Sequence, residues 1–357
     1  MKKIMIAAVA ATMASVSMAD ISIKGDAYIQ YADNAIGKAD NADDTTANRK
    51  RINLNVTGKS GATSVVISLR NDDNNNTGAV EGTGASGGNI KTHQFYLTTK
   101  VGPVDIKAGD FYTTTGLGAV YKGASFSDAL DLSTKVGNAT IGVLTTDNSN
   151  AAGGTAVYAS TKIANVDVMI EHSADKNEVN ADSLGYTNIA AKGTFNGISV
   201  AAEKNNSKVD EANTTLIHVG GKANGIKWDV AQLKNGDAIH AGNAKFAPLG
   251  SMLVGTAARG GTSTAVADSG DFSKITGVAV STKLAGNTVK AIYTNLKTSG
   301  TGTSPTTVLN DTIKGTEIIL TRALSGGKLT VNLGKISGSE SDTANATNTG
   351  VRFDVKF

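Results

Sequence analysis

The sequence predicts an all-β protein that closes into a transmembrane antiparallel up-and-down β-barrel, and three observations favour this fold. Apolar and polar residues alternate along most of the chain, short turns alternate with long polar connections, and an apolar leader precedes the first alternating segment. Alternation with period two is typical of strands whose two faces meet different surroundings. A closed barrel satisfies all backbone hydrogen bonds inside a membrane because it has no free edge.

Composition excludes several classes of protein. The 357 residues include 41 Gly, 3 Pro and no Cys, with 18% charged and 40% hydrophobic residues. Without cysteine there is no thiolate, iron–sulfur or disulfide chemistry. The chain is too apolar to be disordered and too polar for a helical membrane protein. A net charge of +3 gives no reason to expect a nucleic-acid partner.

Residues 1–19 have the features of a secretory signal peptide. Lys2 and Lys3 precede an apolar run at 4–16, and small residues end at Ala19, just before Asp20. The weaker interpretation is a membrane anchor, but the apolar run is shorter than the roughly 18 residues that a spanning helix needs. We expect Sec-type export and cleavage after Ala19, which leaves residues 20–357 as a single barrel domain.

The first mature segment shows the alternation clearly. Ile21, Ile23 and Ile29 share one face, whereas Lys24 and Asp26 share the other. The pattern returns at 51–56, 64–70 and 351–357. The connections take up nearly half of the mature chain, which leaves about nine residues per strand, close to the length that crosses a membrane at a tilt.

Tight turns separate pairs of these segments, and several are Asn-Gly or Gly-Gly pairs, which supply the positive φ of two-residue hairpins. The expected turns are Ser60-Gly61, Gly102-Pro103, Gly137-Asn138, Ala164-Asn165, Asn196-Gly197, Asn224-Gly225, Pro248-Leu249-Gly250, Gly286-Asn287 and Gly326-Gly327. Two strands per turn and one more at each end of the chain predict 20 strands, and 16 or 18 also remain open.

A soluble β-sandwich would also explain the alternation as core against water. It does not explain why the short turns recur at one end of the strands and the long polar connections at the other. A transmembrane barrel explains both features, because it has short periplasmic turns, long extracellular loops, and strands that alternate lipid-facing apolar with lumen-facing polar residues. The barrel is therefore the interpretation that we carry forward.

Four segments together resemble the general diffusion porins of Gram-negative bacteria. They lie at 23–27, 93–97, 102–110 and 350–357, in the porin order and behind a signal peptide. The resemblance implies a sixteen-stranded outer-membrane barrel that assembles as a homotrimer. It also implies partners in the outer-membrane lipid, in lipopolysaccharide and in the barrel assembly machinery.

The resemblance further implies that residues 111–128 form the third loop, which porins fold inward as a constriction. The candidate constriction residues are Asp110, Tyr112, Tyr121 and Lys122. The acidic cluster usual in that loop is missing, so a constriction with strongly opposed charged walls is not expected.

The last strand resembles the signal by which outer-membrane barrels are recognised for assembly. Val351, Phe353, Val355 and the final Phe357 occupy one face of a regularly alternating segment. Other barrels and sandwiches can also finish on an alternating strand.

The expected pore wall is basic, because basic residues on the polar faces outnumber acidic ones about two to one. The candidate pore-lining residues are Lys24, Asp26, Arg51, Arg70, Asp105, Lys107, Lys290 and Arg352. We predict a water-filled channel for passive diffusion of small hydrophilic solutes and ions, with a weak anion preference. The alternative is that these charges neutralise one another.

Two other functions remain open. The barrel could be a substrate-selective channel, or a structural surface protein without an open pore. An enzyme is not expected, because the four histidines lie on separate predicted strands without metal-ligand spacing. His218 alone points inward, so it is the one histidine that could join a Ser-His-acid site. We predict no catalytic residue, cofactor or metal.

Overall fold

The computed structural model describes residues 20–36, 44–46, 48–75, 90–114, 116–117, 122–145, 154–176, 184–207, 213–235, 248–251, 272–298, 312–337 and 346–357. These residues form 19 strand segments. The segments are β1 (Asp20–Ile36), β2 (Asp44–Thr46), β3 (Asn48–Ser60), β4 (Thr63–Asn75), β5 (Lys91–Val101), β6 (Val104–Thr114), β7 (Lys122–Val136), β8 (Ala139–Thr145), β9 (Thr155–Ile163), β10 (Val166–Lys176), β11 (Leu184–Phe195), β12 (Ile198–Ser207), β13 (Thr214–Ala223), β14 (Ile226–Asn235), β15 (Phe272–Leu284), β16 (Asn287–Thr298), β17 (Thr312–Leu324), β18 (Gly327–Ser337) and β19 (Ala346–Lys356). Among the described residues, no helix is long and apolar enough to cross a membrane.

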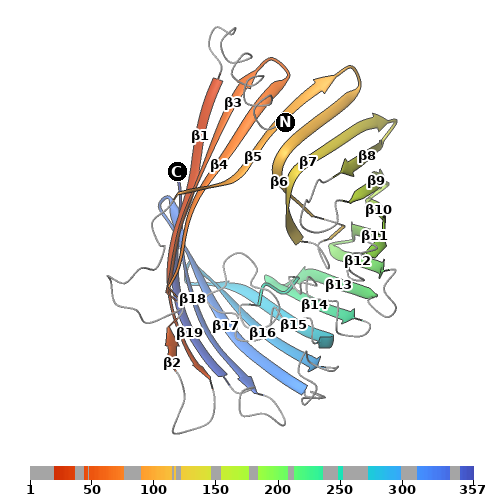
Figure 1. Cartoon of the computed structure of the whole chain (residues 1–357). Helices are drawn as coiled ribbons and strands as arrows, with labels where there is room; N and C mark the ends of the chain where they lie inside the picture. The colour runs from red at the N-terminus through yellow and green to blue at the C-terminus, as the bar shows by residue number, and fades with distance from the viewer. Residues whose placement is uncertain are drawn as a thin grey trace.

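The strands form one antiparallel sheet that closes on itself. Each strand pairs with its neighbours in the sequence, and β1 pairs with β19 from Asp26↔Lys356 to Ile36↔Ala346. Figure 1 shows β1, in red, beside the blue strands of the carboxy-terminal end. Because β2 and β3 both pair with the same side of β1, they count as one wall strand, and 18 strands go round the described barrel. The predicted closed all-β barrel is confirmed.

The connections alternate in length as the sequence predicts. Eight two-residue turns join the hairpins of the described strands, so one end of the barrel, the short-turn end, differs from the long-connection end. In the turn at 196–197, Asn196 and Gly197 have φ of 49° and 82°. The pair at 224–225 has 50° and 81°. Positive φ at both positions matches the right-handed twist of the flanking strands, which explains the Asn-Gly pairs.

The predicted turn at Pro248-Leu249-Gly250 is wrong, and so is the count of 20 strands. Residues 248–251 instead belong to the connection between β14 and β15, which spans 236–271. Gly250 has φ of 61°, so the residue chemistry of a turn is present. The four described residues lie against the inner wall rather than between two paired strands. A Pro-Gly signal reports local backbone geometry, and it cannot tell a hairpin from a bend in a long connection.

The two faces of the wall match the alternation in the sequence. On β1, Ile21 and Ile29 are 67% and 44% exposed, whereas Tyr28 and Gln30 are buried. The same outward apolar face continues through Ile217 on β13. Apolar side chains therefore cover the outside, where lipid would solvate them, and the opposite face of each strand points into the barrel.

The seam between the first and last strands needs a glycine. Gly25 and Phe357 exchange two backbone hydrogen bonds of 2.7 and 3.0 Å. A Cβ on Gly25 would lie 2.4 Å from Cε2 of Phe357, so the phenyl ring occupies the space that any larger residue would need. The four outward residues proposed as an assembly signal lie along this seam, with Phe357 60% exposed. Their role in assembly stays a prediction.

We expect Gly25→Leu to weaken the barrel at its seam. The added side chain forces the Phe357 ring away, and overpacking of this kind costs about 1–3 kcal/mol. The folded form should convert to the unfolded form at a lower temperature, measured as heat-modifiable gel mobility. Ile23→Leu, an outward substitution on the same strand, is the control. Equal thermal stability of the two variants would contradict the seam argument.

Candidate pore and its lining

An arginine cluster lines the inner wall where the barrel closes. Arg352 of β19 and Arg51 of β3 lie over the ring of Tyr28 of β1, at 3.7 and 5.5 Å from the ring centroid. Arg352 donates to Oδ1 of Asp354 through Nε at 2.8 Å and Nη2 at 2.5 Å. The pairing of a guanidinium with an aromatic face and a carboxylate holds the arginine side chain flat against the wall.

A polar chain continues this cluster onto β4. Arg70 Nε donates to Oδ1 of Asn53 at 2.7 Å, and Asn53 Nδ2 donates to Oδ2 of Asp26 at 2.7 Å. Four of the predicted pore-lining residues are thus brought to one side of the barrel. They are Asp26, Arg51, Arg70 and Arg352.

The other predicted pore-lining residues lie apart from this cluster. Lys24 is exposed on β1, and Asp105 forms an ion pair of 3.5 Å with Lys100 beside the turn at 102–103. Lys107 lies on β6 and Lys290 on β16. The sequence supplies the face on which each residue lies, but only the register brings residues from distant strands together.

Lys107 rests on an aromatic patch of the inner wall. Its Nζ lies 4.0 Å from the ring centroid of Phe111 and 4.5 Å from that of Tyr96. Phe111 is buried with Ala129 and Leu144 from the next two strands. Such contacts stabilise an ammonium group that is partly removed from water.

The predicted third loop is shorter than the expected range of 111–128. Strand β6 continues to Thr114 and β7 begins at Lys122, so this connection, which we name the third connection, spans 115–121. Tyr112 is on the face of β6 opposite to Phe111, and its ring lies 4.7 Å from that of His93. Tyr121 and the side chain of Lys122 lie outside the described residues. Asp110 accepts a hydrogen bond of 2.9 Å from the backbone of Asp128.

The described part of this connection reaches across to β12. The backbone N–H of Leu117 donates to Oε2 of Glu203 at 2.8 Å, although 86 positions separate the two residues. Gly116 has φ of 53°, and a Cβ there would lie 2.7 Å from Nδ2 of Asn188. The backbone therefore approaches the wall closely, and glycine is required for it. Whether the segment constricts a pore stays a prediction.

Acidic side chains gather on the wall beside this connection. Tyr158 donates to Oδ1 of Asp131 at 2.6 Å, and Tyr186 donates to Glu171. Glu203 is 2% exposed. These carboxylates come from β7, β10 and β12, whereas the arginine cluster comes from β1, β3, β4 and β19. The acidic charge that the loop lacks is thus supplied by the strands.

A second inward segment lies on the wall of β15 to β17. Lys290 Nζ donates to the carbonyl oxygen of Leu249, and Ser251 Oγ donates to Oε2 of Glu317 at 3.0 Å. Leu249 is fully buried, and a Cβ on Gly277 would lie 2.5 Å from its Cδ1. We name residues 248–251 the inner latch.

Apolar residues also face inward around the inner latch, and the period-two rule does not predict them. Leu233, Ile275 and Ile336 have 0–1% of their surface exposed, on the inward face of β14, β15 and β18. A water-filled interior would leave such residues wet. Their burial means that side chains fill part of the interior. The apolar run around Leu249 is the feature of the sequence that could have indicated this packing.

Lysines line the short-turn end of the interior from β9 to β15. They border two adjoining cavities of about 590 and 650 Å³. The lysines are Lys162, Lys192, Lys222, Lys227 and Lys283. We name these five residues the lysine wall.

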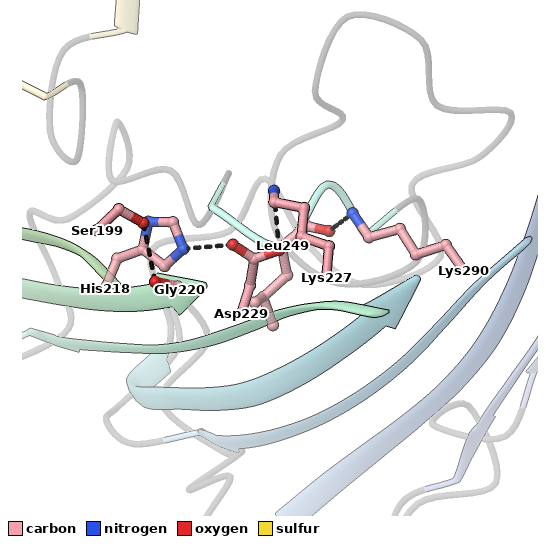
Figure 2. Close-up of polar contacts among 7 residues, drawn as sticks. All are labelled: Ser199, His218, Gly220, Lys227, Asp229, Leu249 and Lys290. Carbon is pink, nitrogen blue, oxygen red and sulfur yellow. Dashed lines mark hydrogen bonds and ion pairs between the residues drawn. The ribbon is translucent and has the colours of Figure 1, made fainter. Parts of the chain in front are cut away.

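Figure 2 shows how acidic and imidazole groups meet this wall. Asp229 lies 3.1 Å from Nζ of Lys227 and 3.0 Å from Nε2 of His218. Ser199 donates to the carbonyl oxygen of Gly220 at 3.1 Å rather than to the imidazole. His218 faces inward as expected, but this geometry gives it no activated serine. Within the described part of the chain, no group of three or more His, Asp or Glu could hold a metal ion.

We expect Ser251→Ala to loosen the inner latch. The change leaves a buried carboxylate without one donor, which costs about 1–3 kcal/mol. Single-channel recordings in a planar bilayer should then show more frequent transitions between conductance levels. Ser64→Ala, which removes a hydroxyl of β4, a strand far along the sheet from the β15 to β17 wall that holds the latch, is the control. Unchanged transitions in Ser251→Ala would show that the latch does not limit the pore.

Comparison with known proteins finds similarity at the level of structure. No protein-family model and no curated protein matches the sequence. The outer membrane protein OprD from Pseudomonas aeruginosa has a TM-score of 0.64 at 11% identity, covering 95% of this chain and 94% of that chain. A BenF-like porin from Pseudomonas fluorescens Pf-5 has a TM-score of 0.62 at 11% identity, covering 95% and 98%. OccAB1 from Acinetobacter baumannii has a TM-score of 0.62 at 10% identity, covering 95% and 96%.

At this identity the likeness concerns the fold alone. The chain shares an 18-stranded antiparallel barrel with these proteins over nearly its whole length. The resemblance to general diffusion porins implied sixteen strands, so it is confirmed for the porin-type barrel and not for that particular family.

Proposed function

We propose that this barrel is an outer-membrane porin, which forms a water-filled channel for passive diffusion of small hydrophilic solutes with a preference for anions. The fold that it shares with a porin and with an outer membrane protein supports the channel. The outward apolar face supports a place in a bilayer.

The lysine wall is the observation that supports the anion preference. Five lysines border the cavities at the short-turn end, and of the acidic residues only Asp167 lines the same two cavities. Charges of one sign along a narrow aqueous path raise the local concentration of the opposite ion. The carboxylates beside the third connection act against this preference, so we expect it to be weak.

A substrate-selective channel is the second candidate. The inner latch and the connection at 116–117 are both hydrogen-bonded to the inner wall, and segments in these places would narrow the path through the barrel. A narrow path lined by fixed charges discriminates among solutes by size and polarity. A structural barrel without an open pore is the third possibility, and single-channel conductance separates it from the other two.

The remaining parts of the proposal concern assembly and location. We propose export through the predicted signal peptide at 1–19, insertion by the barrel assembly machinery, contacts with lipopolysaccharide, and a homotrimer in the outer membrane of a Gram-negative bacterium. The shared fold with porins favours a channel over an enzyme.

The reversal potential in a planar bilayer under a salt gradient tests the anion preference. We expect the sign that indicates anion selectivity. Replacing Lys222, Lys227 and Lys283 by Gln should lower the ratio of anion to cation permeability by about two- to threefold, because removing charges weakens the local potential.

The matched control replaces three lysines of the outward faces, Lys234, Lys297 and Lys314, by Gln. This control removes the same number of positive charges as the lysine-wall variant and should leave the ratio of anion to cation permeability unchanged. Clear cation selectivity of the unaltered protein would overturn the anion preference. Absence of stable conductance steps would overturn the channel itself.

A further inference from the structure

We propose that a pocket between the third connection and strands β7 to β11 binds small primary ammonium cations. The pocket has a volume of about 240 Å³. Thr113 and Gly116 border it on the side of the connection, and Asp131, Glu171 and Asn188 border it on the wall. The inference rests on the proposed channel function, because solutes reach the pocket through the barrel interior.

Two carboxylates of the pocket are oriented by tyrosines. Tyr158 donates to Oδ1 of Asp131 at 2.6 Å, and Tyr186 donates to Glu171. An ionised carboxylate has about four lone-pair sites, and the phenol donor fixes the direction of the carboxylate that it binds. Lys107 lies across from Asp131 and offsets its charge, but the carboxylate of Glu171 still leaves this part of the wall acidic, which favours a ligand that brings positive charge and several N–H donors.

Asn188 provides an independent indication of a ligand with N–H groups. Its side chain is 1% exposed, and its Nδ2 donates to Oε1 of Glu203 at 2.8 Å. The Oδ1 atom of the same amide is buried and has no hydrogen-bond partner among the described residues. A buried acceptor without a donor is costly, by about 1–3 kcal/mol. An ammonium N–H in the pocket would supply the missing donor.

The rest of the pocket suits a short carbon chain. Leu144 and Met169 contribute to its lining, beside the ring of Tyr158. Apolar side chains next to carboxylates favour an organic cation over a strongly hydrated inorganic one, because the apolar part loses contact with water on binding. The described residues also contain no cluster of three or more His, Asp or Glu side chains that could hold a metal ion.

The pocket also has a structural reason to hold its shape. The Leu117 N–H donates to Glu203 at 2.8 Å, and Glu203 accepts in turn from Asn188. The third connection is therefore tied to the same carboxylate that positions the Asn188 amide. A ligand that occupies the pocket would lie directly against the backbone of the connection and would narrow the path beside it.

Block of single-channel current by n-butylammonium tests the proposal. We expect n-butylammonium to interrupt the current in a concentration-dependent manner. The variants Asp131→Asn and Glu171→Gln should each raise the half-blocking concentration about tenfold, which corresponds to about 1.4 kcal/mol. Tetramethylammonium has no N–H donor and should block more weakly.

The matched control is Asp167→Asn, which removes one inward carboxylate of β10 near the short-turn end, outside the pocket. It should leave the half-blocking concentration unchanged, and heat-modifiable gel mobility shows that each variant is folded. Equal half-blocking concentrations of n-butylammonium in the control and in the pocket variants would overturn the proposal. In the unaltered protein, block by tetramethylammonium as strong as that by n-butylammonium, or stronger block by Ca²⁺, would also overturn it.

The two proposals fail in different ways. If the unaltered protein gives no stable conductance steps, the proposed channel function is wrong. If it gives stable steps that n-butylammonium does not interrupt, the channel stands and the ammonium pocket is wrong.

Discussion

Closure of the sheet between β1 and β19 is the constraint on which the rest of the structure depends. Each strand must donate and accept along both edges, because a backbone group facing lipid has no water to bond. The seam meets this requirement through the paired backbones of Gly25 and Phe357. Once the sheet is closed, the strand faces are divided into an outward apolar set and an inward set, and the register then decides which inward residues meet.

The interior is organised by charge on different parts of the wall. Arginines gather on β3, β4 and β19 beside β1, carboxylates on β7, β10 and β12, and lysines at the short-turn end. These groups come from strands far apart in the sequence, and their positions depend on the register of the ladder. Two inward segments, around Leu117 and Leu249, lie among them and are fixed by hydrogen bonds to buried carboxylates of the wall and to the ammonium group of Lys290.

Local patterns predicted the wall well and the interior poorly. The alternation on β1 gave the correct faces for Ile21 and Tyr28, and the Asn-Gly pairs gave correct turns, because both depend on neighbours in sequence. The bend at 248–250 misled the strand count because its residues have turn chemistry without a hairpin. The cluster of Arg51 with Arg352 was beyond prediction, since it needs the pairing of the first strand with the last.

The sequence by itself determined the all-β class, the alternation of faces, most of the turns and the basic character of the inward side chains. All of these follow from residue type and spacing of a few positions. Only the tertiary structure decided that 18 strands close the barrel, that carboxylates of the wall lie beside the connection at 115–121, and that Leu233 and Ile275 pack inward beside the latch. These features require contacts between residues that are remote in sequence, and the period of a strand carries no information about such contacts.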